Sequence, residues 1–341
     1  MSTEQISCGF FSRAYLLLNL KEKTMKRVSI GGQAVLEGIM MKGPESYALA
    51  VRKPDKEIDV QVTPYKSLGE KHKPANFPIV RGVINFIESL YIGMSTLMKS
   101  SEYFEDEEEE KKSKKTKEEK PKDKEKSSAG DKASLVFTLF VSLAIAIGIF
   151  MLLPAFLAKL IFKEGTNELL INLTEGVMRL VIFIVYVALI SMMEDIKRTF
   201  MYHGAEHKTI NCLEAGDDLT VENVRKHTRF HKRCGTSFVF IVMIVSIVVF
   251  MFVRTETMWL RLLSRLLLIP VIAGISYEFI RYAGKHNNVC STVLSQPGLW
   301  VQRLTTKEPD DSMIEVAIKS VEAVIDWREY VKCVRDDSFE K

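Results

Sequence analysis

The chain has few cysteines and little excess charge, and both shortages exclude classes of protein. Its 341 residues contain five cysteines, an odd number, and carry a formal net charge of +4. The cysteines stand far apart, at Cys8, Cys212, Cys234, Cys290 and Cys333. Scattered cysteines argue against a disulfide-stabilised secreted domain and suit a reducing compartment. A charge of +4 is too small to indicate a nucleic-acid partner, and we expect none.

Charged and apolar residues are strongly segregated along the chain. Residues 104–133 are almost entirely charged, whereas four other runs are almost entirely apolar. These runs are 135–162, 177–193, 238–253 and 262–280. A helix needs about 20 residues to cross the hydrocarbon core of a bilayer. The runs favour a mainly α-helical, polytopic membrane protein with about four transmembrane helices over a large soluble protein with buried helices.

The distribution of lysine and arginine predicts the orientation of these helices. The polar segment 194–237 holds Lys197, Arg198, Lys208, Arg225, Lys226, Arg229, Lys232 and Arg233. The connection 163–176 offers only Lys163, and 254–261 offers only Arg254 and Arg261. Because cytoplasmic loops carry the excess of basic residues, we expect both termini and segment 194–237 in the cytoplasm. The lipid bilayer of the plasma membrane is then the main partner; a monomer and a homo-oligomer both remain open.

The residues before the first apolar run predict a small cytoplasmic portion. Tyr47–Arg52 and Ile58–Thr63 are rich in β-formers and flank a turn that contains Pro54 and Asp55, which predicts a β-hairpin. Residues 79–99 have the apolar spacing of an amphipathic helix. The string from Gly31 to Met41 is expected to be a loop that docks against the membrane domain.

These patterns divide the chain into five parts. The predicted divisions are a dispensable leader (1–25), a β-hairpin with an amphipathic helix (26–103), a charged disordered linker (104–133), a four-span membrane domain (134–283) and a C-terminal cytoplasmic tail with a helix over 312–332 (284–341).

Four of the six histidines fall within segment 194–237. His203, Glu206 and His207 form an H-x-x-E-H string, the inverted zincin arrangement. Residues four apart on a helix share a face, so both imidazoles can reach one ion. In hydrolytic zinc sites a neighbouring carboxylate takes a proton from water, which makes Glu206 the candidate catalytic base. The alternative is a solvated helix on which these histidines lie among lysine and glutamate.

Further candidate ligands lie downstream. His227 and His231 form a second pair at helical spacing, and Cys234 follows closely enough to join the same site. A closed structural zinc with four protein ligands and an open site with water in the last position both remain open. Glu278, at the end of the fourth apolar run, is a candidate distant ligand, with a salt bridge to Arg281 as the alternative.

Several motifs, taken together and in order, resemble the YqhQ-like family of bacterial membrane proteins. The motifs are Gly31-Gly-Gln-Ala-Val-Leu-Glu-Gly-Ile-Met-Met, Tyr202-His-Gly-Ala-Glu-His-Lys208, His231-Lys-Arg-Cys-Gly-Thr236, Pro297-Gly-Leu-Trp and Thr305-Thr-Lys-Glu-Pro. The resemblance extends over roughly residues 26–334. It implies a polytopic membrane protein and carries the description of metal-dependent enzyme onto His203, Glu206, His207, His231 and Cys234. It supplies no substrate.

Three functions are compatible with these observations. The first is a membrane-embedded hydrolase that uses a divalent metal, most naturally zinc, at its cytoplasmic face, with an amide or ester as substrate. The second is a non-catalytic scaffold or regulator in which the metal is structural. The third is a transporter, although four spans are few for one.

Overall fold

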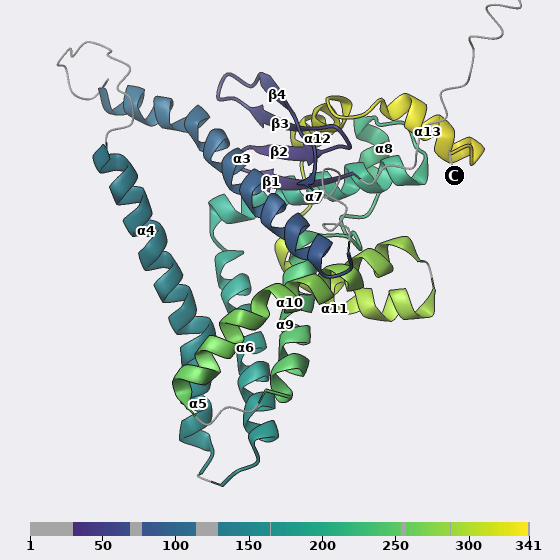
Figure 1. Ribbon diagram of the computed structural model, residues 1–341. Coiled ribbons are helices and arrows are strands. Elements are labelled where there is room, and N and C mark those ends of the chain that lie inside the picture. Colours follow the sequence, from purple (N-terminus) through teal and green to yellow (C-terminus); the bar gives the residue numbers. More distant parts are fainter. Residues whose placement is uncertain are drawn as a thin grey trace, which may run out of the picture.

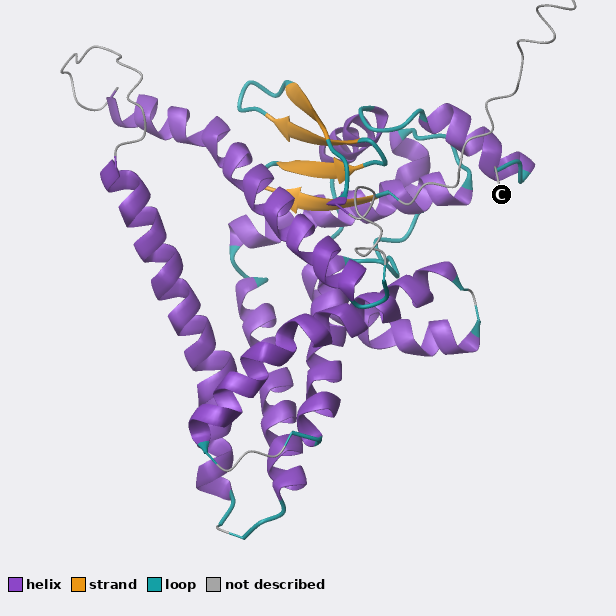
Figure 2. Ribbon diagram, viewed as in Figure 1, coloured by secondary structure: helices purple, strands orange, loops and turns teal. Residues whose placement is uncertain are grey.

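The computed structural model describes residues 30–68, 77–113, 129–163, 165–253, 257–286 and 288–339, in a small sheet and a set of helices (Figures 1 and 2). The strands are β1 (Gly31–Val35), β2 (Gly38–Lys42), β3 (Ser46–Arg52) and β4 (Ile58–Pro64). The helices are α3 (Val80–Ser113), α4 (Ala129–Ile147), the π-helical turn η2 (Gly148–Leu152), α5 (Leu153–Ile161), α6 (Glu168–Ile190), α7 (Glu194–Ala215), α8 (Val221–Lys226), α9 (Gly235–Met251), α10 (Met258–Lys285), α11 (Val289–Thr305), α12 (Asp311–Glu322) and α13 (Trp327–Asp336). The fold is mainly helical, as expected.

The strands form an antiparallel meander in the order β1-β2-β3-β4. The predicted hairpin is β3 and β4, joined in register from Arg52 and Ile58 outward. The expected docking loop is instead a second hairpin, β1 and β2, closed by a two-residue turn in which Glu37 has a φ of +49°. Every residue of β2 except Lys42 is buried, so this strand lacks the polar alternation by which a sequence indicates a half-exposed strand.

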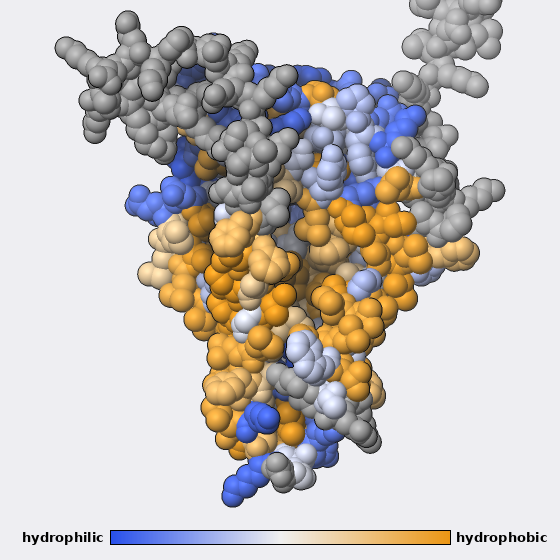
Figure 3. Space-filling model, turned by 60° about the vertical axis from the view of Figure 1, so that its left-hand side comes forward, coloured by the Kyte–Doolittle hydropathy of each residue, from blue (hydrophilic) through white to orange (hydrophobic). Residues whose placement is uncertain are grey.

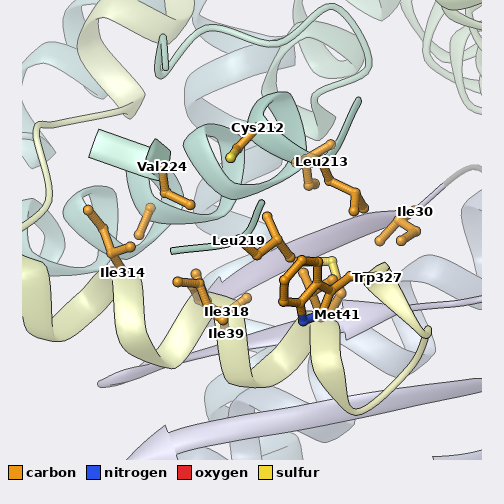
Figure 4. Packing of buried hydrophobic residues seen from close by; sticks show 14 of the residues in the cluster. Ile30, Ile39, Met41, Cys212, Leu213, Leu219, Val224, Ile314, Ile318 and Trp327 are labelled. Atoms are coloured by element: carbon orange, nitrogen blue, oxygen red, sulfur yellow. The ribbon is translucent and has the colours of Figure 1, made fainter. Parts of the chain in front are cut away.

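The sheet lies between two layers of helix. On one face Val35, Met40 and Leu49 pack against Ile92 of α3. On the other face the alternate residues of the strands pack against α7 and α12, because successive side chains of a strand point to opposite sides. Figure 4 shows this second core, in which Ile39 and Met41 of β2 lie near Ile318 of α12. The sheet therefore fixes α7, which carries the H-x-x-E-H string, against β1.

Below this layered portion stands a bundle of apolar helices. Three helical segments are long and apolar enough to cross a membrane: Phe140–Ile161, Glu168–Ile190 and Leu262–Lys285. Only 11%, 22% and 28% of their most apolar windows are buried, so their side chains form the apolar surface over the middle of the molecule, with hydrophilic residues above and at the lower tip (Figure 3). This exposure argues against the buried helices of a large soluble protein.

The predicted count of about four transmembrane helices is wrong. Among the described residues, three helical segments are long and apolar enough to cross a membrane. The third apolar run forms α9, a helix of 17 residues that starts only at Gly235 and ends at Met251. At a rise of about 1.5 Å per residue it is roughly 26 Å long, slightly shorter than a hydrocarbon core of about 30 Å.

The charged residues that interrupt the apolar runs pair within the bundle. Glu175 of α6 forms a buried ion pair with Arg265 of α10. Arg179 donates from Nε to the carbonyl oxygen of Phe150 in the π-helical turn, over 2.8 Å. Charged groups in an apolar environment require such partners, which here connect α6 to its neighbours.

Several boundaries differ from those expected. Helix α3 continues to Ser113, into the segment expected to be a linker, whose Glu and Lys residues are good helix formers. The expected helix over 312–332 is two helices, α12 and α13, because Asp326 caps a new helix by accepting from the backbone N–H groups of Arg328 and Glu329. The leader (1–25) and residues 114–128 lie outside the described residues.

Gly204 permits the closest contact between α7 and the segment that follows α11. A β-carbon at Gly204 would lie 2.0 Å from the carbonyl oxygen of Lys307, whose N–H donates to the carbonyl of Phe200. We therefore expect Gly204→Ala to destabilise the protein by about 1–3 kcal/mol, the usual cost of overpacking, although alanine favours a helix by about 1 kcal/mol.

Thermal unfolding of the detergent-solubilised protein measures this effect. Gly235→Ala is the matched control, because a β-carbon at Gly235 meets no atom within 4 Å. A melting temperature for Gly204→Ala equal to or above that of the parent protein would contradict the close contact.

Candidate metal centre

Helix α7 presents the predicted histidine pair on one face. His203 and His207 are one helical turn apart, and their ring centroids are separated by 4.3 Å. Glu206 lies in the same turn and is 4% exposed, and His207 is 1% exposed. The solvated-helix alternative fails, because the face that carries these side chains is buried in the fold.

Cys234 approaches the pair from a different element. It is the N-cap residue of α9, and its Sγ lies 3.2 Å from Nε2 of His203. One ligand atom from each of His203, His207 and Cys234 lies within 4.8 Å of the other two. Two imidazole nitrogens and one thiolate form a donor set that suits a zinc ion.

Backbone carbonyls fix the protonation of both imidazoles. Nδ1 of His203 lies 2.8 Å from the carbonyl oxygen of Thr305, and Nδ1 of His207 lies 2.7 Å from that of Arg229. A carbonyl oxygen only accepts, so each Nδ1 must carry the proton. Each Nε2 then directs a lone pair toward the site, which is the usual arrangement behind metal-binding histidines.

The charges within the site favour a metal-binding thiolate. Burial alone would raise the pKa of Cys234, but the imidazoles of His203 and His207 lower it well below its usual range. Burial alone would lower the pKa of His203, and the facing sulfur of Cys234 instead raises it to about 9. Both pKa shifts favour the ionised sulfur, which is the form of cysteine that binds metal ions.

Glu206 has one oxygen engaged and one free. Its Oε1 accepts a hydrogen bond of 3.1 Å from the backbone N–H of Gly32 in β1. Its Oε2 is buried and has no hydrogen-bond partner among the described residues. Burial raises the pKa of this carboxyl group against the lowering effect of His203 and His207. A buried carboxylate oxygen without a partner, next to three ligand atoms, fits a site made for a cation.

His231 lies at the edge of the group. Its ring centroid is 5.7 Å from that of His207, and its Nε2 lies 3.4 Å from Oε2 of Glu214. The side chain of Gln302 accepts from the His231 N–H and donates to the His231 carbonyl oxygen, which fixes this part of the backbone. His231 therefore lies next to the three ligand residues, but its ring is bonded to Glu214 and is not one of the three.

Two candidate ligands lie elsewhere. Helix α8 ends at Lys226, so residues 227 to 231 are not helical and the second histidine pair does not share a face. His227 turns to Asp217, with 2.9 Å between Nε2 and Oδ2. Glu278 pairs with Arg81 of α3, with 2.6 Å between Oε1 and Nε, and its carboxylate lies 3.8 Å from Arg281. The salt-bridge alternative for Glu278 agrees with the structure.

The residues that support the ligands are not among the candidates that the sequence offered. Glu214 lies seven residues after His207 on the same helix, a spacing that could have placed it on the same face. Gln302 and Thr305 belong to α11, where they form a buried polar face with Thr306 at helical spacing. The contribution of Arg229 is its backbone carbonyl, which no sequence pattern reveals.

A cavity of about 540 Å³ adjoins the ligand atoms. It is lined by β1 on one side, by α3 through Ser89 and Ile92, and by α7 together with the segment that begins α9. His203, Glu206 and His207 all line it. The candidate centre is thus open to a ligand of small-molecule or short-peptide size.

Metal analysis of the purified full-length protein tests the ligand group. We expect about one transition-metal ion per chain in the parent protein and its loss in the His203→Ala/His207→Ala double variant, because two of three ligand atoms are removed. His227→Ala is the matched control and should keep the metal, because its side chain lies outside the group. Equal metal content in the parent protein and the double variant would contradict the site.

Comparisons with known proteins identify a family but no activity. A family model described as protein of unknown function (DUF1385) matches residues 77–327. The chain is 38% identical over 308 residues to a Bacillus subtilis (strain 168) protein named Uncharacterized protein YqhQ, which covers 85% of this chain and 90% of that protein. No solved structure matches. The chain therefore belongs to the YqhQ-like family, described as DUF1385.

Proposed function

We propose that this chain is an integral membrane protein with a metal-dependent hydrolase site at the cytoplasmic face of the membrane. The observation that carries the proposal is the free, buried Oε2 of Glu206 beside the ligand atoms of His203, His207 and Cys234. A structural metal site does not require a buried carboxylate oxygen that lacks a hydrogen-bond partner. A hydrolytic site needs a proton acceptor at that position.

The membrane assignment is supported by the exposed apolar surface of the three long helices and by the position of the basic residues. Cys234 caps α9 where this helix enters the apolar bundle, and α7 lies in the layered portion beside the sheet (Figure 1). Segment 194–237, which comprises α7 and the connection to α9, carries most of the basic residues between the apolar runs, and this favours the cytoplasmic side.

The side chains divide the proposed chemistry among them. A divalent ion held by His203, His207 and Cys234, most naturally zinc, would polarise a scissile carbonyl group and activate water. Glu206 accepts the proton that water loses and returns it to the leaving group. Gly32 holds the other carboxylate oxygen, so that the proton-accepting oxygen stays directed into the site. The substrate is an amide or an ester that fits the cavity.

A structural metal is the second candidate, supported by where the ligands lie. They connect α7 to the start of α9, so a metal ion would hold the layered portion against the bundle. His231 is near enough to His207 to become a fourth ligand if its side chain rotates away from Glu214. In that case Glu206 would have no catalytic part.

Glu206→Gln separates the two candidates. We expect it to retain the metal ion and to lower hydrolysis of a panel of fluorogenic peptide amides and carboxylic esters by about 10²- to 10⁴-fold, the usual contribution of a general base. The protein is assayed in lipid nanodiscs, with metal content measured on the same samples. His227→Gln is the control for a polar change near the site. Parent and Glu206→Gln proteins with equal turnover and equal metal content would refute the hydrolase proposal.

A further inference from the structure

Strand β1 lies at the edge of the sheet and borders the cavity from Gly31 to Ala34. Among the residues that the structure describes, it pairs with β2 on one side and with no strand on the other. Residues Ile30 to Ala34, five in succession, line the cavity. Helix α3 bounds the cavity from one face of the sheet, and α7 bounds it from the other. The cavity is thus a slot along the unpaired side of a strand, with the metal ligands in one wall.

The backbone of β1 presents polar groups to this slot. Val35 and Gly38 flank the two-residue turn and form a hydrogen-bonded pair of the antiparallel ladder. In such a ladder every second residue of a strand directs its N–H and C=O groups away from the partner strand. In β1 these residues are Gly32 and Ala34. The N–H of Gly32 donates to Glu206 across this edge, in agreement with that alternation. The backbone of Ala34 makes no hydrogen bond across the edge to any residue that the structure describes.

The side chains of β1 leave room for another backbone. Three of its five residues are Gly31, Gly32 and Ala34. A β-carbon at Gly31 would meet no atom within 4 Å. Glycine within a strand costs stability, and it recurs where a ligand or a second backbone approaches closely. An open strand edge is also an aggregation hazard unless it is covered or used.

We infer that the substrate of this site is a polypeptide, bound in extended form as an additional strand on the edge of β1. This inference rests on the proposed hydrolase function and names its substrate class. An extended peptide presents N–H and C=O groups to a neighbouring strand at every second residue. These groups can pair with the C=O of Gly32 and with the N–H and C=O of Ala34, while the N–H of Gly32 stays bonded to Glu206. A lipid tail offers no such groups. The amide bond that passes Glu206 is the one hydrolysed.

The reaction that follows is balanced with one water molecule. The water oxygen bonds to the carbonyl carbon of the peptide, and Glu206 takes a proton from that water. The C–N bond then breaks, and Glu206 passes the proton to the departing amine. The products are one peptide with a new carboxylate and one with a new amino group.

Backbone methylation of a peptide tests the strand addition directly. Random decapeptides capped at both ends are screened for retention by the full-length Glu206→Gln protein in nanodiscs, with empty nanodiscs as background. The best binder is then made in two forms, with N-methyl groups on its odd or on its even amide nitrogens. Only one set of amides faces β1, so we expect one form to bind about tenfold or more weakly and the other to bind as before.

A change in the protein tests the same edge. Gly31→Val should weaken peptide binding about tenfold or more, because Gly31 lines the cavity and a β-carbon there meets no atom of the fold within 4 Å. Gly148→Val is the matched control, because a β-carbon at Gly148 also meets no atom within 4 Å and lies in the π-helical turn of the bundle. Metal content reports that both variants keep the site.

The outcomes separate this inference from the function on which it rests. No peptide retained above empty nanodiscs, or equal binding of both methylated forms, overturns the strand addition, even if Glu206-dependent ester hydrolysis is found. Methylation-dependent binding that Gly31→Val weakens supports it. If such peptides bind but are never cleaved by the parent protein, the hydrolase proposal fails while β1 remains a peptide-binding edge.

Discussion

The candidate centre depends on two hydrogen bonds that its histidines donate to backbone carbonyl groups. The carbonyl oxygens of Thr305 and Arg229 each accept from a histidine Nδ1, and so direct both Nε2 atoms of α7 to the same point. One carbonyl stands at the end of α11 and the other in the segment before α9. Because these elements are distant in sequence, the ligand geometry forms only when the whole fold does.

The same constraint explains why a small sheet accompanies a bundle of apolar helices. The sheet places β1 against α7, so that the N–H of Gly32 can hold Glu206. The bundle places Cys234 at the start of α9, where its sulfur meets His203. Gln302, fully buried in α11, holds the backbone of His231 between them. The sheet, the helix bundle and α11 thus each position part of the site, and none of them would form it alone.

The close approach of the elements also explains small residues that otherwise weaken local structure. Gly204 lies within α7, the helix that carries the histidines, and the carbonyl oxygen of Lys307 packs directly against it. Gly32 lies within β1, where a β-carbon would come too close to both Met40 and Glu206. In both cases the glycine lets a backbone or a carboxylate come nearer than any side chain would allow.

The sequence by itself determined the segregation into apolar helices and a polar histidine segment. It offered His203, Glu206, His207 and Cys234 within a larger candidate set that also held His227, His231 and Glu278. Helical spacing and hydropathy are local properties, so they are readable without a fold. The tertiary structure decided what is not local: that His227 turns to Asp217, that Glu278 pairs with Arg81, and that the segment from Gly31 is a sheet edge. These outcomes depend on which distant groups come within hydrogen-bond distance, and the packing of α7, α11 and β1 sets those distances.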